Sequence, residues 1–290
     1  MRLGGVEAGG TKFVCAVGEG PGITERVSFP TTQPGETIAR AIEFFRDHEV
    51  AAIGIASFGP VDLDRTSPTY GYITATPKEG WRNIDIAGPF VKAFGLPIGF
   101  DTDVNGAALG ESVWGAGQGL GDVLYLTVGT GIGGGALSGG KPVHGMIHPE
   151  MGHVRVPRDS ADPFSGCCPF HGDCLEGLAS GTAMFQRWGA RAQDLGDDHP
   201  AWRMEARYLA LGILNFVMTL SPQRVIAGGG VMHRTLLYDL VREEFHRLVN
   251  GYLQSPLLAN LDSYIVAPGL GDDAGVLGAI ALARHALALQ

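Results

Sequence analysis

Cysteine is scarce in this chain of 290 residues, which has four, and three of them fall within one stretch, GCCPFHGDCLE (166–176). Residues 1–20 also lack the basic start and apolar core of a secretory signal. We therefore expect a cytoplasmic protein, in which thiols stay reduced. A disulfide is then a weak explanation for the clustered thiols, whereas a metal site agrees with both the compartment and the spacing.

Long apolar runs and runs of basic residues are missing as well. No stretch approaches the roughly 20 apolar residues that a membrane-spanning helix needs. The net charge is −9, and Lys and Arg form no cluster, which argues against duplex DNA or an anionic membrane as a partner. A hydrophobic content of 45% and a charged content of 18% indicate a soluble globular protein. Small molecules are the expected ligands.

Glycine, in contrast, is abundant, with 45 residues that arrive in clusters. This is far above ordinary usage, and it indicates backbone that approaches a ligand rather than flexible linkers. The length allows one large α/β unit or two packed domains, and we favour two.

The apolar pattern predicts alternating strands and helices. A strand, a glycine turn and a second strand are expected in residues 2–20, followed by a helix at 36–48, a strand within 50–62, and a strand followed by a helix in 96–116. Such alternation implies a mostly parallel, buried sheet.

The second half repeats this order, since residues 121–143 again read as strand, glycine turn and strand. Helices are expected at 202–220, 236–248 and 272–289, and strands at 224–231 and 263–268. We therefore predict two related lobes with a ligand cleft between them and a linker near 115–121. The predicted domains are 1–118, completed by the helix at 275–290, and 119–274.

The glycine turns allow two explanations. Gly129, Gly131 and Gly134 literally match the dinucleotide fingerprint, but the residues that follow are glycine-broken and cannot form the helix which that fingerprint requires. A strand, turn and strand with Thr127 and Thr130 instead suits a phosphate chain, and AGGTK (8–12) has the same chemistry plus a cation. The alternative is two tight turns that demand positive φ. The presence of both loops, together with AGGGV (227–231), favours phosphate binding.

Seven motifs in order, GVEAGGTK, FDTDVNGAALGE, VGTGIGGG, HPEMGH, CPFHGDCLEGLASG, IAGGGV and GDDAGVLGA, resemble those of the ROK-family sugar kinases and span nearly the whole chain. KFVCAVG, SPTYGYITATPKEGW and the cysteine stretch look most like the family's zinc-containing bacterial fructokinases. The resemblance implies a two-lobed, actin-like (ribonuclease H-like) ATPase fold with duplicated cores. It also implies ATP and Mg²⁺ as cosubstrates, a sugar bound in the cleft, and a homodimer.

The resemblance also implies the site residues. Asp103 corresponds to the catalytic base, a choice that chemistry alone leaves open, because Asp101 is equally acidic and Asp is a favoured helix N-cap. The positions that correspond to sugar-binding residues are Gly59, Asn83, Thr102, Asp103, Glu150, His153 and Glu176. Those that correspond to ATP or phosphate contacts are Gly10, Thr11, Lys12, Thr130, Gly131, Gly228, Gly229 and Gly230. The family usually has Asn at position 102 and Asp at position 7, where this chain has Thr102 and Glu7, which leaves a sugar contact and a magnesium role open.

The cysteine stretch now has an expected purpose. Cys168, His171 and Cys174 follow one another at steps of three residues, and His153 lies fifteen residues upstream of Cys168. Thiolate and imidazole ligands in a closed tetrahedron indicate a structural Zn²⁺ site. Relatives often have a third Cys where this chain has His171. Cys167 is left over, as a small core residue.

The expected activity is therefore ATP-dependent phosphorylation of a hexose, first of all D-fructose to fructose 6-phosphate. Mannose, glucose and an N-acetyl hexosamine are the alternative substrates. A sugar-sensing repressor of the same family would need an N-terminal helix-turn-helix domain, for which we see no room before GGVEAGGTK. A non-catalytic sugar-binding protein is disfavoured by Asp103 and the two phosphate loops.

Overall fold

The computed structural model describes residues 1–289, which form two compact units. Unit 1 comprises Met1–Gly119, Gly140–Pro149 and the C-terminal segment from Gly269 onward, and unit 2 comprises Leu120–Gly139 and Glu150–Pro268. The chain thus passes between the units more than once.

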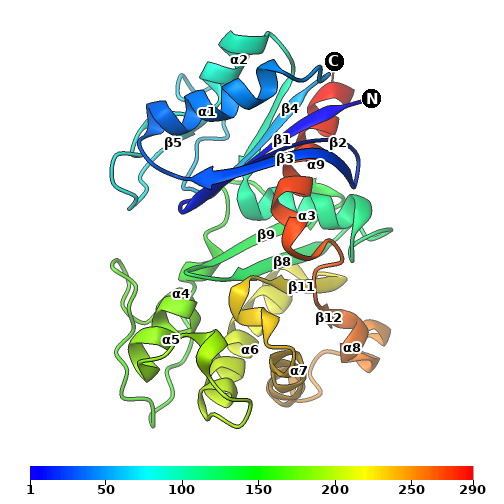
Figure 1. Ribbon diagram of the computed structural model, residues 1–290. Coiled ribbons are helices and arrows are strands. Elements are labelled where there is room, and N and C mark those ends of the chain that lie inside the picture. The colour runs from blue at the N-terminus through cyan, green and yellow to red at the C-terminus, as the bar shows by residue number, and fades with distance from the viewer. Residues whose placement is uncertain (290) are drawn as a thin grey trace. The chain divides into compact units, whose positions relative to one another are not determined.

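Unit 1 is built on a five-stranded sheet in the order β3-β2-β1-β4-β7 (Figure 1). Its strands are β1 (Leu3–Ala8), β2 (Lys12–Glu19), β3 (Gly22–Pro30), β4 (Ile53–Ser57) and β7 (Ile98–Thr102). The first three strands are antiparallel neighbours, whereas β1, β4 and β7 run parallel. Every residue of β4 is buried, as expected for a parallel strand covered on both faces. The helices of this unit are α1 (Pro34–Arg46), α2 (Gly88–Phe94), α3 (Asp103–Trp114) and α9 (Ala274–Ala288), and a small hairpin pairs β5 (Tyr72–Ile73) with β6 (Ile84–Asp85).

Helix α9 lies directly on this sheet, and glycine makes the approach possible. A Cβ on Gly54 of β4 would collide with the carbonyl oxygen of Ala279, and one on Gly278 would collide with the backbone of Gly106 in α3. Part of the glycine excess therefore serves helix packing, and not only the approach of backbone to a ligand as the composition led us to expect.

A second sheet, in the order β10-β9-β8-β11-β12, repeats the plan, and all of its strands except β10 belong to unit 2. The strands are β8 (Val123–Val128), β9 (Ile132–Ser138), β10 (Lys141–Pro142), β11 (Arg224–Gly228) and β12 (Ile265–Val266). β8 is antiparallel to β9 and parallel to β11, which is parallel to β12. In both sheets the first strand therefore forms a hairpin with the second and a parallel pair with the fourth, which confirms the predicted duplication of the core.

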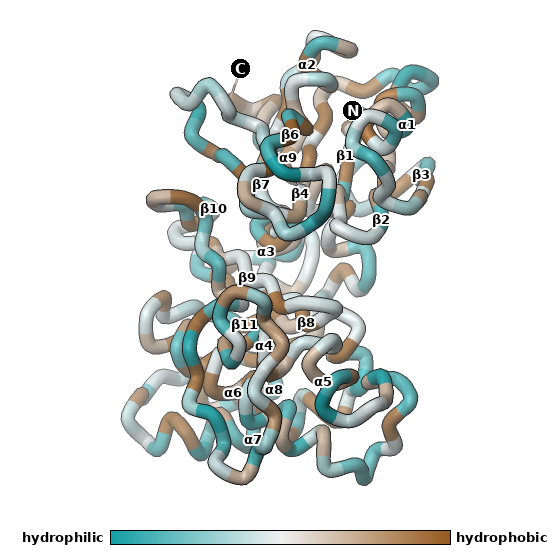
Figure 2. Tube along the Cα trace, turned by 90° about the vertical axis from the view of Figure 1, so that its left-hand side faces the viewer, coloured by the Kyte–Doolittle hydropathy of each residue, from teal (hydrophilic) through white to brown (hydrophobic). Residues whose placement is uncertain are grey.

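The helices of unit 2 are α4 (Leu175–Ala179), α5 (Gly181–Trp188), α6 (Ala201–Leu220), α7 (Leu236–Val249) and α8 (Leu261–Tyr264). The predicted helices at 36–48, 202–220, 236–248 and 272–289 are all confirmed within a few residues. Along the trace, α1 and α7 alternate between hydrophobic and hydrophilic residues, as helices with one buried face do (Figure 2). Among residues 1–289, none of the helices is both long enough and apolar enough to cross a bilayer.

The predicted strand at 263–268 was partly wrong, because Ser263 and Tyr264 end helix α8 and only Ile265–Val266 pairs as a strand. A local signal explains the difference. The Asn260 side chain accepts a hydrogen bond from the backbone N–H of Asp262 at 3.1 Å and caps the helix.

Candidate functional site

Asp103 lies where β7 gives way to α3, as its first helical residue. The N-cap is Thr102, whose Oγ1 accepts from the backbone N–H of Asn105 at 3.1 Å. The cap therefore comes from Thr102, and the N-cap alternative for Asp103 is excluded. Asp103 is half-buried, and its Oδ1 accepts from the backbone N–H of Val104 at 2.9 Å.

Asp101 occupies a different environment. Its side chain is buried, and Oδ1 accepts from the Thr102 backbone N–H and from the Asn105 amide, both at 2.8 Å. Its Oδ2 lies 2.9 Å from Nε2 of His144. With both oxygens engaged inside the unit, this carboxylate is a structural element of the turn, and Asp103 is the better candidate to act on a ligand.

Two other predicted sugar contacts, Gly59 and Asn83, also lie in unit 1. Gly59 is packed against His148, since a Cβ at this position would lie 3.3 Å from the imidazole Cε1. Asn83 has a left-handed backbone, with φ of 57°. Asn tolerates this conformation better than most residues.

The two predicted sugar-binding carboxylates of unit 2, Glu150 and Glu176, interact electrostatically. Glu176 stands on α4, and its Oε2 accepts from the backbone N–H of Ile132 at 3.0 Å. Glu150 is open to solvent on one side, but the protein around its carboxyl, with a smaller contribution from Glu176, raises its pKa to about 7. A group that titrates near neutrality is typical of functional sites.

The glycine turn after β8 is hydrogen-bonded to the start of α5. The backbone N–H of Gly181, at the start of α5, donates to the carbonyl of Gly129 at 2.7 Å, and the Thr182 hydroxyl donates to the carbonyl of Thr130 at 2.7 Å. A Cβ on Gly131 would lie 2.5 Å from the Glu176 carboxylate, so a larger residue here would displace that side chain. No dinucleotide-type helix follows, since β9 begins at Ile132.

Gly228, Gly229 and Gly230 follow β11 in the same unit. Gly229 has φ of 93°, and a Cβ there would lie 2.5 Å from the Val128 carbonyl oxygen at the end of β8. The predicted phosphate loop and the AGGGV segment are thus neighbours, as a shared nucleotide site requires.

A cavity of about 630 Å³ opens beside Gly230. Trp202 and Arg234 line it, and the Arg234 guanidinium lies 5.3 Å from the centre of the Trp202 ring and 2.6 Å from a carboxylate oxygen of Asp197. The remaining lining comes from Ala192, Gln193, Val231, His233, Thr235 and Leu236. Sequence reasoning missed this wall, because only Gly230 belongs to a motif.

The other predicted phosphate loop, with Gly10, Thr11 and Lys12, is the turn between β1 and β2 in unit 1. Gly9 N–H donates to the Lys12 carbonyl at 3.0 Å, which closes the turn and leaves the Lys12 side chain exposed. Glu7 lies beside it. Burial raises the pKa of Glu7, and the nearby Lys12 ammonium acts in the opposite direction.

The four predicted metal ligands come together in unit 2. The ligand atoms of His153, Cys168, His171 and Cys174 all lie within 4.8 Å of one another. Nδ1 of His153 is 3.6 Å from Sγ of both cysteines, and Nδ1 of His171 is 3.7 Å from Sγ of Cys168. Sulfur and nitrogen ligands at tetrahedral positions around one Zn²⁺ would be about 3.5 Å apart, from bond lengths of roughly 2.3 and 2.0 Å. The donor set and its spacing therefore fit Zn²⁺.

Cys167 stands outside this group. Its Sγ lies 4.0 Å from the hydroxyl of Ser180, and the side chain is half-buried. Its sulfur does not belong to the group of ligand atoms that lie within 4.8 Å of one another.

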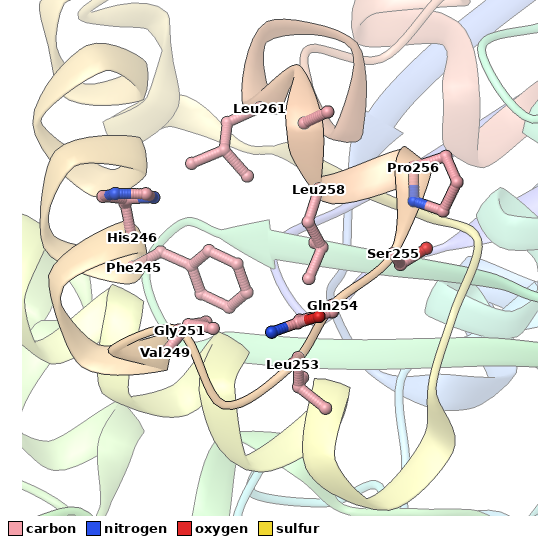
Figure 3. A pocket seen from close by; sticks show the side chains of 11 residues that line it. Phe245, His246, Val249, Gly251, Leu253, Gln254, Ser255, Pro256, Leu258 and Leu261 are labelled. Carbon is pink, nitrogen blue, oxygen red and sulfur yellow. The ribbon is translucent and has the colours of Figure 1, made fainter.

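A second cavity, of about 480 Å³, lies between α7 and residues 251–261 (Figure 3). Phe245, Leu258 and Leu261 face it, and none of the predicted site residues lines it. It therefore adds nothing to the candidate site.

Comparison with known proteins agrees with these features. Residues 3–286 match the model of the ROK family. The chain is 48% identical to a putative fructokinase of Bacillus subtilis, over 98% of this chain and 96% of that protein. It is also 48% identical to a fructokinase of Zymomonas mobilis, again over 98% of this chain and 96% of the relative.

Solved structures show the same fold. The ROK hexokinase of Thermus thermophilus superposes with a TM-score of 0.79 at 29% identity, covering 100% of both chains. A ROK family glucokinase of Streptomyces griseus, in complex with glucose and AMPPNP, has a TM-score of 0.76 at 29% identity and covers 98% of this chain and 100% of its own. The expected actin-like ATPase fold is confirmed. With its duplicated core and a family match over almost all residues, this chain belongs to the ROK family.

Proposed function

We propose that this protein is an ATP-dependent fructokinase, which transfers the terminal phosphoryl group of ATP to the 6-hydroxyl of D-fructose. The observation that carries the proposal is the 48% identity to two proteins named as fructokinases over nearly the full length. The glucokinase of known structure shares only 29%. Mannose is the expected secondary substrate.

Asp103 is the proposed general base. Phosphoryl transfer has a loose transition state, so the base chiefly orients the sugar hydroxyl and accepts its proton late. A half-buried carboxylate on the first turn of α3 is suited to this task, because the helix holds its backbone rigidly. Asp101 is the less suitable of the two aspartates, since its oxygens are engaged by the turn and by His144.

Glu150, His153 and Glu176 are the proposed sugar ligands in unit 2, where carboxylate oxygens accept hydrogen bonds from sugar hydroxyls. Asn83 and the backbone of Gly59 and Thr102 are the proposed sugar contacts of unit 1. A site built to pair particular hydroxyls rejects analogues that lack them, by up to about 10⁴-fold.

The nucleotide is proposed to bind with its phosphates along Thr130–Gly131 and Gly228–Gly230, and with its base in the adjoining cavity of about 630 Å³. A planar guanidinium beside an indole ring gives that cavity a face on which an aromatic base can stack. Gly10, Thr11 and Lys12 are proposed to stabilise charge on the transferring phosphoryl group. Mg²⁺ is expected with ATP, and Glu7 supplies an oxygen of the kind that Mg²⁺ takes as a ligand.

The proposed Zn²⁺ has a structural role. His153, Cys168, His171 and Cys174 would close its tetrahedron, leaving no open position for substrate. Because His153 contributes Nδ1 to the group, the metal would orient this imidazole and with it the loop that carries Glu150. We further propose a cytoplasmic homodimer.

A coupled ADP-release assay across a panel of hexoses tests the class and the substrate together. ADP release that depends on both ATP and fructose is the expected result. Binding of sugar without any turnover would instead indicate a non-catalytic member of the family.

A further inference from the structure

The segment Gly140–Pro149 is attached to unit 1 through two histidines. His144 Nε2 lies 2.9 Å from Oδ2 of Asp101, and His148 Nε2 accepts from the backbone N–H of Val61 at 3.0 Å. Between these two contacts the chain turns outward, and Met146 is 97% exposed. The family motifs assign no role to His144, although it reaches the residue that shapes the Asp103 turn.

Asp101 transmits that contact to the turn. One carboxylate oxygen accepts from the Thr102 backbone N–H and from the Asn105 side chain, and the other faces His144. A buried carboxylate is costly unless it is paired and hydrogen-bonded. His144 is in contact with this carboxylate and pairs its charge when the imidazole is protonated. Without His144, the Asp101 carboxylate would turn toward water or take up a proton. Both of its hydrogen bonds at the start of α3 would then weaken.

We propose that His144 is a positioning residue for phosphoryl transfer, which acts through Asp101 to hold the turn that presents Asp103. This inference rests on the proposed function, since it assigns His144 to the same reaction. His144 touches neither substrate nor the reacting atoms in this role.

The proposal predicts a pH dependence, because the ion pair with Asp101 requires a protonated His144. Its hydrogen bond to Asp101 raises the pKa of His144, while partial burial opposes this. The other groups around the pair are Tyr70, which has the guanidinium of Arg65 5.6 Å from its ring centre, and His148, whose pKa is lowered by burial. Because the pKa of His144 is raised in the folded protein, the ion pair is complete below the ordinary pKa of His and is lost as pH rises through the raised value.

The experiment compares His144→Leu, His144→Gln and a matched control, His48→Leu. His48 forms a similar pair in the same unit, with Nε2 2.7 Å from Oε2 of Glu25.

Loss of a hydrogen bond to a charged group corresponds to roughly a tenfold or larger change in an equilibrium or rate constant. We therefore expect His144→Leu to lower kcat for fructose about tenfold or more, with little change in KM. Gln keeps a neutral donor, so His144→Gln should recover much of the lost rate. The wild type should lose kcat above the pKa of His144, and His144→Gln should not show this alkaline limb.

His48→Leu should keep the wild-type kcat and change only the melting temperature. A His144→Leu variant with wild-type kcat and pH profile, in an enzyme that phosphorylates fructose, overturns the role of His144 and leaves the proposed function standing. Equal losses of kcat in His144→Leu and His48→Leu would also overturn it, as a general structural effect. A wild type that releases ADP with no hexose overturns the proposed function and the role of His144 together.

Discussion

Two aspartates separated by one residue show what decides a catalytic assignment at the scale of single side chains. Asp101 and Asp103 are equivalent as letters in FDTDVN, but the fold gives Asp101 three internal partners and places Asp103 on the first turn of α3. The partner that completes the Asp101 environment, His144, is 43 positions away in the sequence. Local sequence can therefore predict the turn, but not which of the two carboxylates is engaged by it.

Asp103→Asn should lower kcat by about 10²-fold or more, the usual loss when a general base is removed. The amide preserves the shape of the side chain but cannot accept the proton of the sugar hydroxyl. Melting temperature serves as the control and should stay close to that of the wild type. An Asp103→Asn enzyme with normal turnover would rule out this residue as the base.

Glu150 should give the pH profile an acidic limb. Its pKa is raised to about 7, so the ionised form that accepts hydrogen bonds from sugar is lost as pH falls through this value. We expect kcat/KM for fructose to decline below pH 7 in the wild type, whereas Glu150→Gln should be poorer throughout and lack this limb. Measurement of kcat/KM between pH 5.5 and 8.5, with the ATP concentration saturating, decides the point. A limb that persists unchanged in Glu150→Gln would have to come from another group.

At the scale of elements, the loop before α4 is the part of the molecule that depends on a metal in our account. Zinc content near one ion per chain is expected, and Cys168→Ser should lose both the metal and much of the thermal stability, because removal of a ligand opens a closed tetrahedral site. Cys167→Ser is the matched control, since Cys167 lies outside the group. Full zinc occupancy and normal melting in Cys168→Ser would contradict the assignment.

Helix α6 carries a second stability determinant. Glu205 is fully buried, and neither of its carboxylate oxygens has a hydrogen-bond partner among residues 1–289. Burial raises its pKa well above the ordinary value, with Arg187 as a weaker opposing charge. A folded-state pKa raised in this way means that the folded state holds the proton more tightly, so stability falls as pH rises above the ordinary pKa of Glu.

Glu205→Gln should therefore raise the melting temperature at pH 8 and have a smaller effect near pH 5. Glu43→Gln, on the exposed face of α1, is the control and should be nearly silent at both pH values. Thermal unfolding of the three proteins at the two pH values measures this. A Glu205→Gln protein that melts lower than the wild type at pH 8 would show that the carboxylate is stabilised by its surroundings.

The elements could be predicted where an apolar run indicates a buried strand, as in β4, or where apolar residues recur at helical spacing, as in α7, and less well where a polar side chain decides. The side chain of Asn260 caps helix α8, which takes up Ser263 and Tyr264, two residues of the predicted strand. The use of Gly54 and Gly278 in helix packing was likewise beyond prediction, because it depends on which helix covers the sheet. Three of the four residues of the proposed zinc group could be picked out because their spacing is local, and His153 came from the family motif.

At the scale of the whole molecule, the duplication was visible in the sequence because the two halves share a strand, a glycine turn and a strand before their first parallel partner. The structure extends this likeness to all five strands of each sheet. The wall of the cavity beside Gly230 escaped prediction for the opposite reason. Trp202 and Arg234 come from two separate segments of unit 2, and neither belongs to a repeated pattern.

The sugar preference is the central claim, and direct competition tests it most directly. Fructose, mannose, glucose and N-acetylglucosamine at equal concentrations would be incubated with ATP and the enzyme, and the phosphorylated products resolved by ³¹P NMR, so that product ratios report ratios of kcat/KM. We predict fructose 6-phosphate as the main product, with mannose 6-phosphate second. Glucose 6-phosphate or a phosphorylated N-acetyl hexosamine as the main product would contradict the account.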